Sequence, residues 1–228
     1  MRVAGIVPAA GTGERLGSGG PKAFAPCGGR PLVAWSVDVL AAECDVVVVA
    51  LPPGSPSAGG ELAPAAPAPL VTVRGGASRS QSVKLALAAA GEDLEVVVVH
   101  DAARPLVTPD LVRRCLDAVD SGWDGAIAAA PVTDTVKEVA GDGVGVKRTL
   151  DRARLWAVQT PQAFRFEALR GALEVGDDEL ERATDDASLV EAAGGRVRVV
   201  ESREENFKVT HPADLERAEA LLAARAAA

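Results

Sequence analysis

The 228-residue sequence lacks any run of the roughly 18 uninterrupted apolar residues that a membrane span requires. The longest candidate, residues 31–53, is interrupted by three acidic residues. The apolar stretch at the N-terminus is short and soon reaches charged residues, beginning with Glu14, so it does not have the core of a signal peptide. We therefore expect a cytoplasmic protein with no membrane partner.

Cysteine is also scarce. The three cysteines lie far apart in the sequence, and an odd number at such spacing argues against a disulfide framework. The chain shows no Cys/His metal spacing, no paired carboxylates and no Ser/His/Asp order, so covalent catalysis and metalloprotease chemistry have no candidate residues. We predict reduced, mostly buried thiols and no metal-ligating residues.

Positive charge is in deficit, with 24 Lys plus Arg against 32 Asp plus Glu and a net charge of -8. This balance disfavours the broad basic surface with which proteins bind nucleic acids. An anionic ligand would therefore have to meet a local cluster of cations.

Short valine-rich runs alternate with helical patterns along the chain. Their continuous apolar character is typical of strands that are buried on both faces. The alternation predicts one domain over residues 1–228, with a largely parallel sheet, helices on both faces and ligands at the carboxyl ends of the strands. The predicted strands are 3–7, 46–51, 70–73, 96–99, 126–132 and 197–200, and the predicted helices are 32–44, 78–90, 109–119, 166–175, 185–193 and 213–226.

Two segments interrupt this alternation. Residues 52–69 are rich in Pro, Gly, Ala and Ser and are predicted to form a surface loop. Residues 133–156 mix charged residues with valines around a glycine-rich turn at 141–145, which predicts a protruding β-arm. Hydroxyls and cations on such an arm suggest that it reaches into a neighbouring subunit's cleft.

The first predicted strand leads into a glycine-rich loop, residues 8–22. Small residues let the backbone N–H groups approach phosphates, and Arg15 and Lys22 add positive charge. The spacing matches neither a dinucleotide fingerprint nor a P-loop. We interpret the loop as a triphosphate site, the alternative being a plain turn with a solvated lysine.

Two more polar segments follow predicted strands. The glycines at 75–76 precede Ser78, a potential helix cap, so a base or ribose could rest there or the segment could be only a turn. In the second segment, Asp101 is suited to a magnesium-bound water, a ribose or a substrate hydroxyl, and Arg104 to a phosphate. We assign His100 no catalytic role, because a phosphate nucleophile is already ionised.

The C-terminal half adds further polar candidates. Residues 184–186 fit a helix N-cap, and residues 206–210 are predicted to end a strand, which would place Lys208 at the same sheet edge. The side chains that could carry the chemistry are therefore mainly cations held in fixed positions.

Taken together, these motifs resemble those of the 2-C-methyl-D-erythritol 4-phosphate cytidylyltransferases of the non-mevalonate isoprenoid pathway. The resemblance runs nearly end to end, and the set is specific although each motif alone is weak. The motifs are P-A-A-G-x-G-x-R from Pro8, Pro21-Lys22, G-G-x-x-R-x-x-S-V from Gly75, H-D-A-A-R-P from His100, A-P-V-x-D-T-V-K from Ala130, T-P-Q from Thr160, T-D-D-A-S from Thr184 and N-F-K-V-T from Asn206.

The resemblance implies a Rossmann-like nucleotidyltransferase fold of the glycosyltransferase-A-like type. It implies transfer of CMP from CTP to methylerythritol phosphate, with Mg²⁺ held mainly by the CTP phosphates. It also implies a homodimer through the arm at about 133–156. By the same resemblance, the residues that hold CTP are Ala9, Ala10, Gly11, Gly76 and Ser82, with Arg15, Lys22 and Lys208 as catalytic residues. The polyol phosphate would meet Asp101, Ala102, Arg104, Thr160 and Thr184, joined by Thr135 and Arg152 from a partner's arm.

Two alternatives remain at this point. A ribitol 5-phosphate cytidylyltransferase has a related set of loops, although its residues after the Asp and in the arm would differ. A catalytically silent nucleotide-binding protein is the non-enzyme alternative, and the joint presence of Arg15, Lys22 and Lys208 argues against it.

Overall fold

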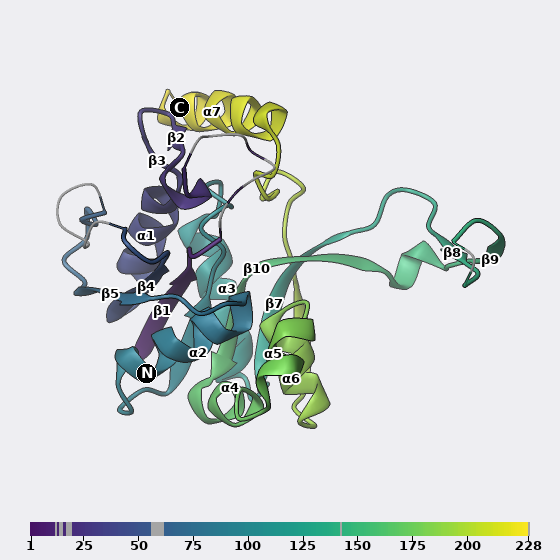
Figure 1. The fold of residues 1–228 in the computed structure, drawn as a ribbon, viewed down its shortest axis with the longest axis horizontal. Coiled ribbons are helices and arrows are strands. Elements are labelled where there is room, and N and C mark those ends of the chain that lie inside the picture. Colours follow the sequence, from purple (N-terminus) through teal and green to yellow (C-terminus); the bar gives the residue numbers. More distant parts are fainter. Residues whose placement is uncertain (12, 14–15, 17–19, 56–61, 142, 228) are drawn as a thin grey trace.

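The computed structural model of the protein describes residues 1–11, 13, 16, 20–55, 62–141 and 143–227. Its centre is a seven-stranded sheet in the order β11–β7–β10–β6–β1–β4–β5 (Figure 1). Strand β10 runs antiparallel to both neighbours and all other pairs are parallel, so the predicted mostly parallel sheet is confirmed. The strands are β1 (Val3–Pro8), β4 (Val46–Leu51), β5 (Leu70–Arg74), β6 (Val96–Val99), β7 (Gly125–Pro131), β10 (Trp156–Arg165) and β11 (Val197–Glu201).

Strand β6 shows why the valine runs become central strands. All four of its valines are buried, and successive side chains point to opposite faces of the sheet. Val96 and Val98 belong to one hydrophobic core, whereas Val97 and Val99 belong to the other. A strand covered on both faces needs apolar residues at consecutive positions, which is the pattern in the sequence.

Helices cover both faces of the sheet, as predicted (Figure 1). The core on one face includes residues of α1 (Leu32–Glu43) and α3 (Pro109–Asp120). The core on the other face includes residues of α2 (Arg79–Ala90), α4 (Phe166–Ala172), α5 (Asp177–Arg182) and α6 (Asp186–Ala192). Within the described parts of the chain, no helix combines the length and apolar character needed to cross a membrane.

Helix α7 (Pro212–Ala226) packs at the carboxyl edge of the sheet and forms a third core there. Its Ala218 and Leu222 join the buried Val209 and Cys27 of the short strand β2 (Pro26–Cys27), which pairs with the short strand β3 (Arg30–Pro31). The backbone N–H of Val209 donates to the carbonyl of Ala103 at 2.8 Å. The segment before α7 is thereby fastened to the turn that follows β6.

The structure differs from the sequence predictions in three places. Strand β10 was not predicted, because a proline at 161 and polar neighbours obscure its pattern, and its register shifts between Val158 and Gln162. Helix α5 was also missed, since Leu180 is its one buried residue. The prediction that residues 206–210 end a strand is wrong, because this segment has no regular structure and follows β11 by several residues.

The predicted β-arm is present. Strands β8 (Lys137–Val139) and β9 (Val146–Thr149) pair antiparallel at its tip and form a sheet separate from the main one, and the short helix η3 (Arg152–Arg154) lies in its returning stem. Figure 1 shows the arm projecting well beyond the body. Val139, Val144 and Val146 are exposed there by 47%, 84% and 63%, so the arm presents apolar side chains away from the core.

The three cysteines, Cys27, Cys44 and Cys115, are free and buried, which confirms the prediction of reduced, buried thiols. Burial raises the pKa of the Cys27 thiol to about 11, so this side chain stays protonated and unreactive at neutral pH.

Candidate active site

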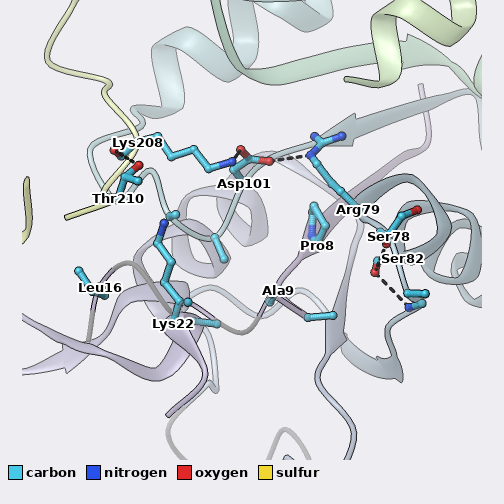
Figure 2. Close-up of a pocket in the computed structure, with 18 residues that line it drawn as sticks. Pro8, Ala9, Leu16, Lys22, Ser78, Arg79, Ser82, Asp101, Lys208 and Thr210 are labelled. Atoms are coloured by element: carbon cyan, nitrogen blue, oxygen red, sulfur yellow. Dashed lines mark hydrogen bonds and ion pairs between the residues drawn. The ribbon is translucent and has the colours of Figure 1, made fainter. Parts of the chain in front are cut away.

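A pocket of about 520 Å³ opens at the carboxyl edge of the sheet. It lies where the loops after β1, β5 and β6 meet, which is the place that a parallel sheet provides for ligands (Figure 2). The residues lining it are Pro8, Ala9, Ala10, Gly11, Gly13, Leu16, Lys22, Ala23, Gly76, Ala77, Ser78, Arg79, Ser82, Asp101, Ala102, Ala103, Lys208 and Thr210.

The loop after β1 forms one wall and brings Lys22 to the pocket, where this residue begins the short helix η2 (Lys22–Phe24). Gly13 has a φ of +74°, and a Cβ atom at this position would lie 2.4 Å from the Cβ of Lys22. Only glycine fits such a backbone conformation and so close an approach. Arg15, the other predicted cation of this loop, lies outside the described residues.

The loop after β5 forms the opposite wall. A Cβ atom on Gly75 would lie 2.3 Å from the Cβ of Ala10, so glycine is what lets the two walls approach each other. The hydroxyl of Ser82 accepts from the backbone N–H of Gly76 at 3.1 Å and donates to the carbonyl of Ser78 at 2.9 Å. Ser78 in turn caps α2, because its side chain accepts from the backbone N–H of Gln81 and its own backbone N–H donates to the Gln81 side chain. These hydrogen bonds hold the wall in one conformation.

Asp101 lies at the back of the pocket between two cations. Its Oδ1 accepts from Nε of Arg79 at 3.0 Å and its Oδ2 accepts from Nζ of Lys208 at 2.7 Å, as Figure 2 shows. Burial alone would raise the pKa of Asp101, but the two cations hold it well below its usual range. Asp101 is therefore ionised throughout the physiological pH range.

A chain of buried hydrogen bonds through His100 and Thr160 holds the backbone of Asp101 in place. Nε2 of His100 lies 3.1 Å from the carbonyl oxygen of Arg104, which can only accept, so Nε2 carries the proton. Nδ1 then accepts from the hydroxyl of Thr160 at 3.0 Å, and the Thr160 oxygen accepts from the backbone N–H of Asp101 at 3.0 Å. Burial lowers the pKa of His100 to about 4, so the ring is neutral and has a structural place in the site.

Four other residues that were predicted to contact the polyol phosphate do not line the pocket. Arg104 does not line it and donates from Nη1 to the carbonyl of Asn206 at 2.7 Å. Thr184 is exposed, just before α6, and does not line the pocket either. Thr135 and Arg152 are exposed on the arm, where the guanidinium of Arg152 donates to the carbonyl of Thr133. The structure thus brings together Ala9, Ala10, Gly11, Lys22, Gly76 and Ser82, the described residues among those predicted for the nucleotide, with Asp101, Ala102 and Lys208, and leaves the arm residues apart from them.

Arg79 was not among the predicted site residues, although it lines the pocket. Its Nη1 donates to Oδ2 of the fully buried Asp186 at 2.7 Å. Burial would lower the pKa of Arg79, but the carboxylates of Asp186 and Asp101 raise it above its ordinary value. The signal was present in the sequence as the arginine of the G-G-x-x-R motif, but its partner lies 107 positions away.

In the part of the chain that the structure describes, no group of three or more His, Cys, Asp or Glu side chains gathers as a metal site. Among the described residues that line the pocket, one carries a carboxylate, Asp101, which is already paired with two cations. This donor set fits a divalent cation that is held by the phosphates of a nucleotide and by water rather than by a protein cage.

Comparison with known proteins gives consistent matches over nearly the whole chain. The family model described as IspD: 2-C-methyl-D-erythritol 4-phosphate cytidylyltransferase matches residues 3–224. A protein of that name from Frankia casuarinae is 49% identical over 224 residues, which cover 97% of this chain and 82% of that protein. Another of the same name from Streptomyces avermitilis is 45% identical over 235 residues, covering 98% and 93% respectively.

Solved structures agree with these matches. The crystal structure of 2-C-methyl-D-erythritol 4-phosphate cytidylyltransferase from Thermus thermophilus has a TM-score of 0.79 and 39% identity, covering 97% of this chain and 98% of that one. The 4-diphosphocytidyl-2C-methyl-D-erythritol synthase from Anaerococcus prevotii has a TM-score of 0.83 and 26% identity, with the same coverage.

Proposed function

This chain belongs to the 2-C-methyl-D-erythritol 4-phosphate cytidylyltransferase family, and we propose that the pocket between the loops after β1, β5 and β6 is the site of its reaction. The enzyme transfers CMP from CTP to 2-C-methyl-D-erythritol 4-phosphate, giving 4-diphosphocytidyl-2-C-methyl-D-erythritol and pyrophosphate in the non-mevalonate pathway to isoprenoids. The relatives do not favour either alternative, the ribitol 5-phosphate enzyme or a silent binding protein. The observation that carries the proposed site is the approach of Lys22 and Lys208 to one pocket beside Asp101.

CTP is proposed to lie between the two walls of the pocket. Residues 9–11, with Arg15 and Lys22, would hold the phosphates and ribose, while Gly76 and Ser82 would fix the cytosine. The support for this placement is that Ala9, Gly11, Lys22, Gly76 and Ser82 all line the pocket. The Ser82–Gly76 bond also keeps the base-binding wall in one conformation.

The polyol phosphate is proposed to lie next to Asp101 and Ala102, which line the pocket. Asp101 would accept from a substrate hydroxyl, since its carboxylate is ionised and cannot donate. Thr160 would act by holding Asp101, because its hydroxyl already donates to His100 and accepts from the Asp101 backbone. Arg104 and Thr184 would contact the phosphate or the polyol at the edge of the site.

The chemical step requires two anionic groups to meet. A phosphate oxygen of the polyol substrate attacks the α-phosphorus of CTP, and the bond from that phosphorus to the bridging oxygen of pyrophosphate breaks. The attacking oxygen is already ionised, so no protein base is needed. Lys22, Lys208 and Arg15 are proposed to stabilise the negative charge that develops on the α-phosphate oxygens and on the leaving pyrophosphate.

A divalent cation, proposed to be Mg²⁺, would be held mainly by the triphosphate, and its contribution when bound is to neutralise phosphate charge. The residues nearest to it would be those of the β1 loop, acting largely through water. Asp101 would stay with Lys208 and Arg79, because its carboxylate already pairs with those two cations.

We further propose that the whole chain forms one nucleotidyltransferase domain that works as a homodimer. The support is the arm at about 133–156, which projects from the body of its own chain (Figure 1) and carries exposed valines together with the exposed Thr135 and Arg152. A second copy would bury the apolar tip and receive these two polar residues at its polyol site. The three free, buried cysteines suit a cytoplasmic location, and the net charge of -8 suits a protein without nucleic-acid partners.

The experiment that tests this function is pyrophosphate release by the purified protein with CTP and Mg²⁺. Release is expected with methylerythritol phosphate and not with ribitol 5-phosphate. Release with ribitol phosphate alone, or with neither substrate, would contradict the proposed use of the pocket. Omitting the metal and then restoring Mg²⁺ or Mn²⁺ tests the metal in the same assay.

A further inference from the structure

Four side chains of alternating charge form a continuous line behind and across the pocket. Asp186 pairs with Arg79 at 2.7 Å, Arg79 with Asp101 at 3.0 Å, and Asp101 with Lys208 at 2.7 Å. The two ends of the line differ in exposure, since the side chain of Asp186 is fully buried whereas that of Lys208 is 43% exposed. One end is thus anchored in the core and the other faces the pocket.

Arg79 is held at two points of its guanidinium group. Nε donates to Asp101 while Nη1 donates to Asp186, so the planar fork is fixed between two carboxylates. The two carboxylates that hold Arg79 come from different parts of the fold, because Asp186 opens α6 whereas Asp101 follows β6. Arg79 itself opens α2. The buried Asp186 carboxylate would carry a large desolvation cost without this partner, so removing either member of the pair alone is costly.

We propose that Arg79 and Asp186 are positioning residues for the known reaction: Asp186 fixes the guanidinium of Arg79, and Arg79 fixes the Asp101 carboxylate toward the polyol phosphate and Lys208. This inference rests on the proposed contact between Asp101 and the polyol. Neither residue needs to touch a substrate in order to act. Their loss should therefore affect the use of methylerythritol phosphate more than the binding of CTP.

The first variant is Asp186→Asn, which keeps the size of the side chain and removes its charge. The expected result is a rise of about tenfold in KM for methylerythritol phosphate, with KM for CTP changed by less than about twofold. The matched control is Asp185→Asn, the same change one residue earlier. Asp185 caps α6 and pairs with Gln162 but makes no bond to Arg79, and Asn is an equally good cap, so both KM values should stay unchanged.

Asp186→Asn could fail to fold, because it leaves the Arg79 charge with one partner. The second variant, Arg79→Met with Asp186→Asn, removes both charges of the buried pair and avoids an unpaired ion in the core. Asp101 then keeps Lys208 as its partner in the line. The same selective rise in KM for methylerythritol phosphate is expected, and thermal unfolding of each variant verifies that it is folded.

A double-mutant cycle separates positioning from a general structural role. If Asp186 acts through Arg79 on Asp101, Asp186→Asn should change KM for methylerythritol phosphate little once Asp101→Asn is present. Additive effects, or equal changes in both KM values, would overturn the inference. If Asp101→Asn alone leaves KM for methylerythritol phosphate unchanged, the proposed polyol contact fails instead, and the two failures are distinguishable.

Discussion

The ammonium group of Lys208 lies 2.7 Å from the carboxylate of Asp101, although the two residues are 107 positions apart. The contact neutralises part of the charge on Lys208 and keeps its side chain at one place in the pocket. A phosphate that approaches Lys208 then meets a cation whose position is already set. Preorganisation of this kind lowers the cost of arranging charges during the reaction.

Lys22→Ala is expected to lower kcat about a hundredfold, because removing one cation that stabilises transition-state charge costs on the order of 3 kcal/mol in activation energy. Steady-state kinetics with both substrates measures this effect. Lys84→Ala is the matched control, since Lys84 is exposed on α2 and does not line the pocket. Near-wild-type turnover of the Lys22 variant would remove this lysine from the proposed mechanism.

Gly75→Ala is expected to push apart the two walls of the pocket. The new Cβ would lie 2.3 Å from the Cβ of Ala10 and 3.0 Å from Oγ of Ser82, so the loops must separate. We expect kcat/KM for CTP to fall by about tenfold or more, since small misplacements of positioning groups are costly. Gly171→Ala in α4 is the control, because nothing lies within 4 Å of its added Cβ. An unchanged kcat/KM would show that the spacing of these walls is unimportant.

The lowered pKa of His100 predicts how the free energy of unfolding changes with pH. Its pKa is lowered by burial to about 4 from an ordinary 6.5, so the unfolded chain binds more protons than the folded one between these values. Stability therefore rises with pH across this window and is lost on acidification, by about 3 kcal/mol from this residue alone. His100→Gln should show a shallower loss between pH 6.5 and 4 in urea unfolding. Parallel curves for the two proteins would contradict the assignment of a neutral His100.

The proposed arm exchange can be tested by mixing two variants that are expected to have strongly reduced but measurable activity, Asp101→Asn and Arg152→Ala. In a mixed dimer, one site would combine an intact Asp101 with an intact Arg152 from the other subunit. Random exchange of subunits should then restore about a quarter of wild-type activity. Mixing Asp101→Asn with Asp101→Asn/Arg152→Ala is the control and should restore none. If neither mixture gains activity after exchange, Arg152 does not act across subunits.

The sequence predicted the central strands well because their residues are selected by one dominant requirement. The four valines of β6 must fill cores on both sides, and the same requirement produces the runs in β1 and β4. Strand β10 escaped prediction since Pro161 breaks its pattern, and α5 escaped because Leu180 is its one buried side chain. Local sequence is informative where burial is uniform along an element.

The pocket was predicted in outline, because loops that follow parallel strands meet at one edge. The line from Asp186 through Arg79 to Asp101 could not be predicted from one sequence. Its contacts join α6 and α2 to the turn after β6, and no local pattern encodes which buried carboxylate meets which arginine. Arg79 itself stood in a recognised motif, but its role depends on those distant partners.

The hydrogen bond from Val209 to Ala103 and the packing of α7 on β2 link the position of Lys208 to the last helix. Lys208 enters the pocket from this attached segment, whereas the seven-stranded sheet is complete by Glu201. Proteolytic clipping or a bulky tag that disturbs α7 should therefore silence the enzyme while leaving most of its secondary structure intact. Retained fold in a purified preparation is, for this protein, no guarantee of an assembled active site.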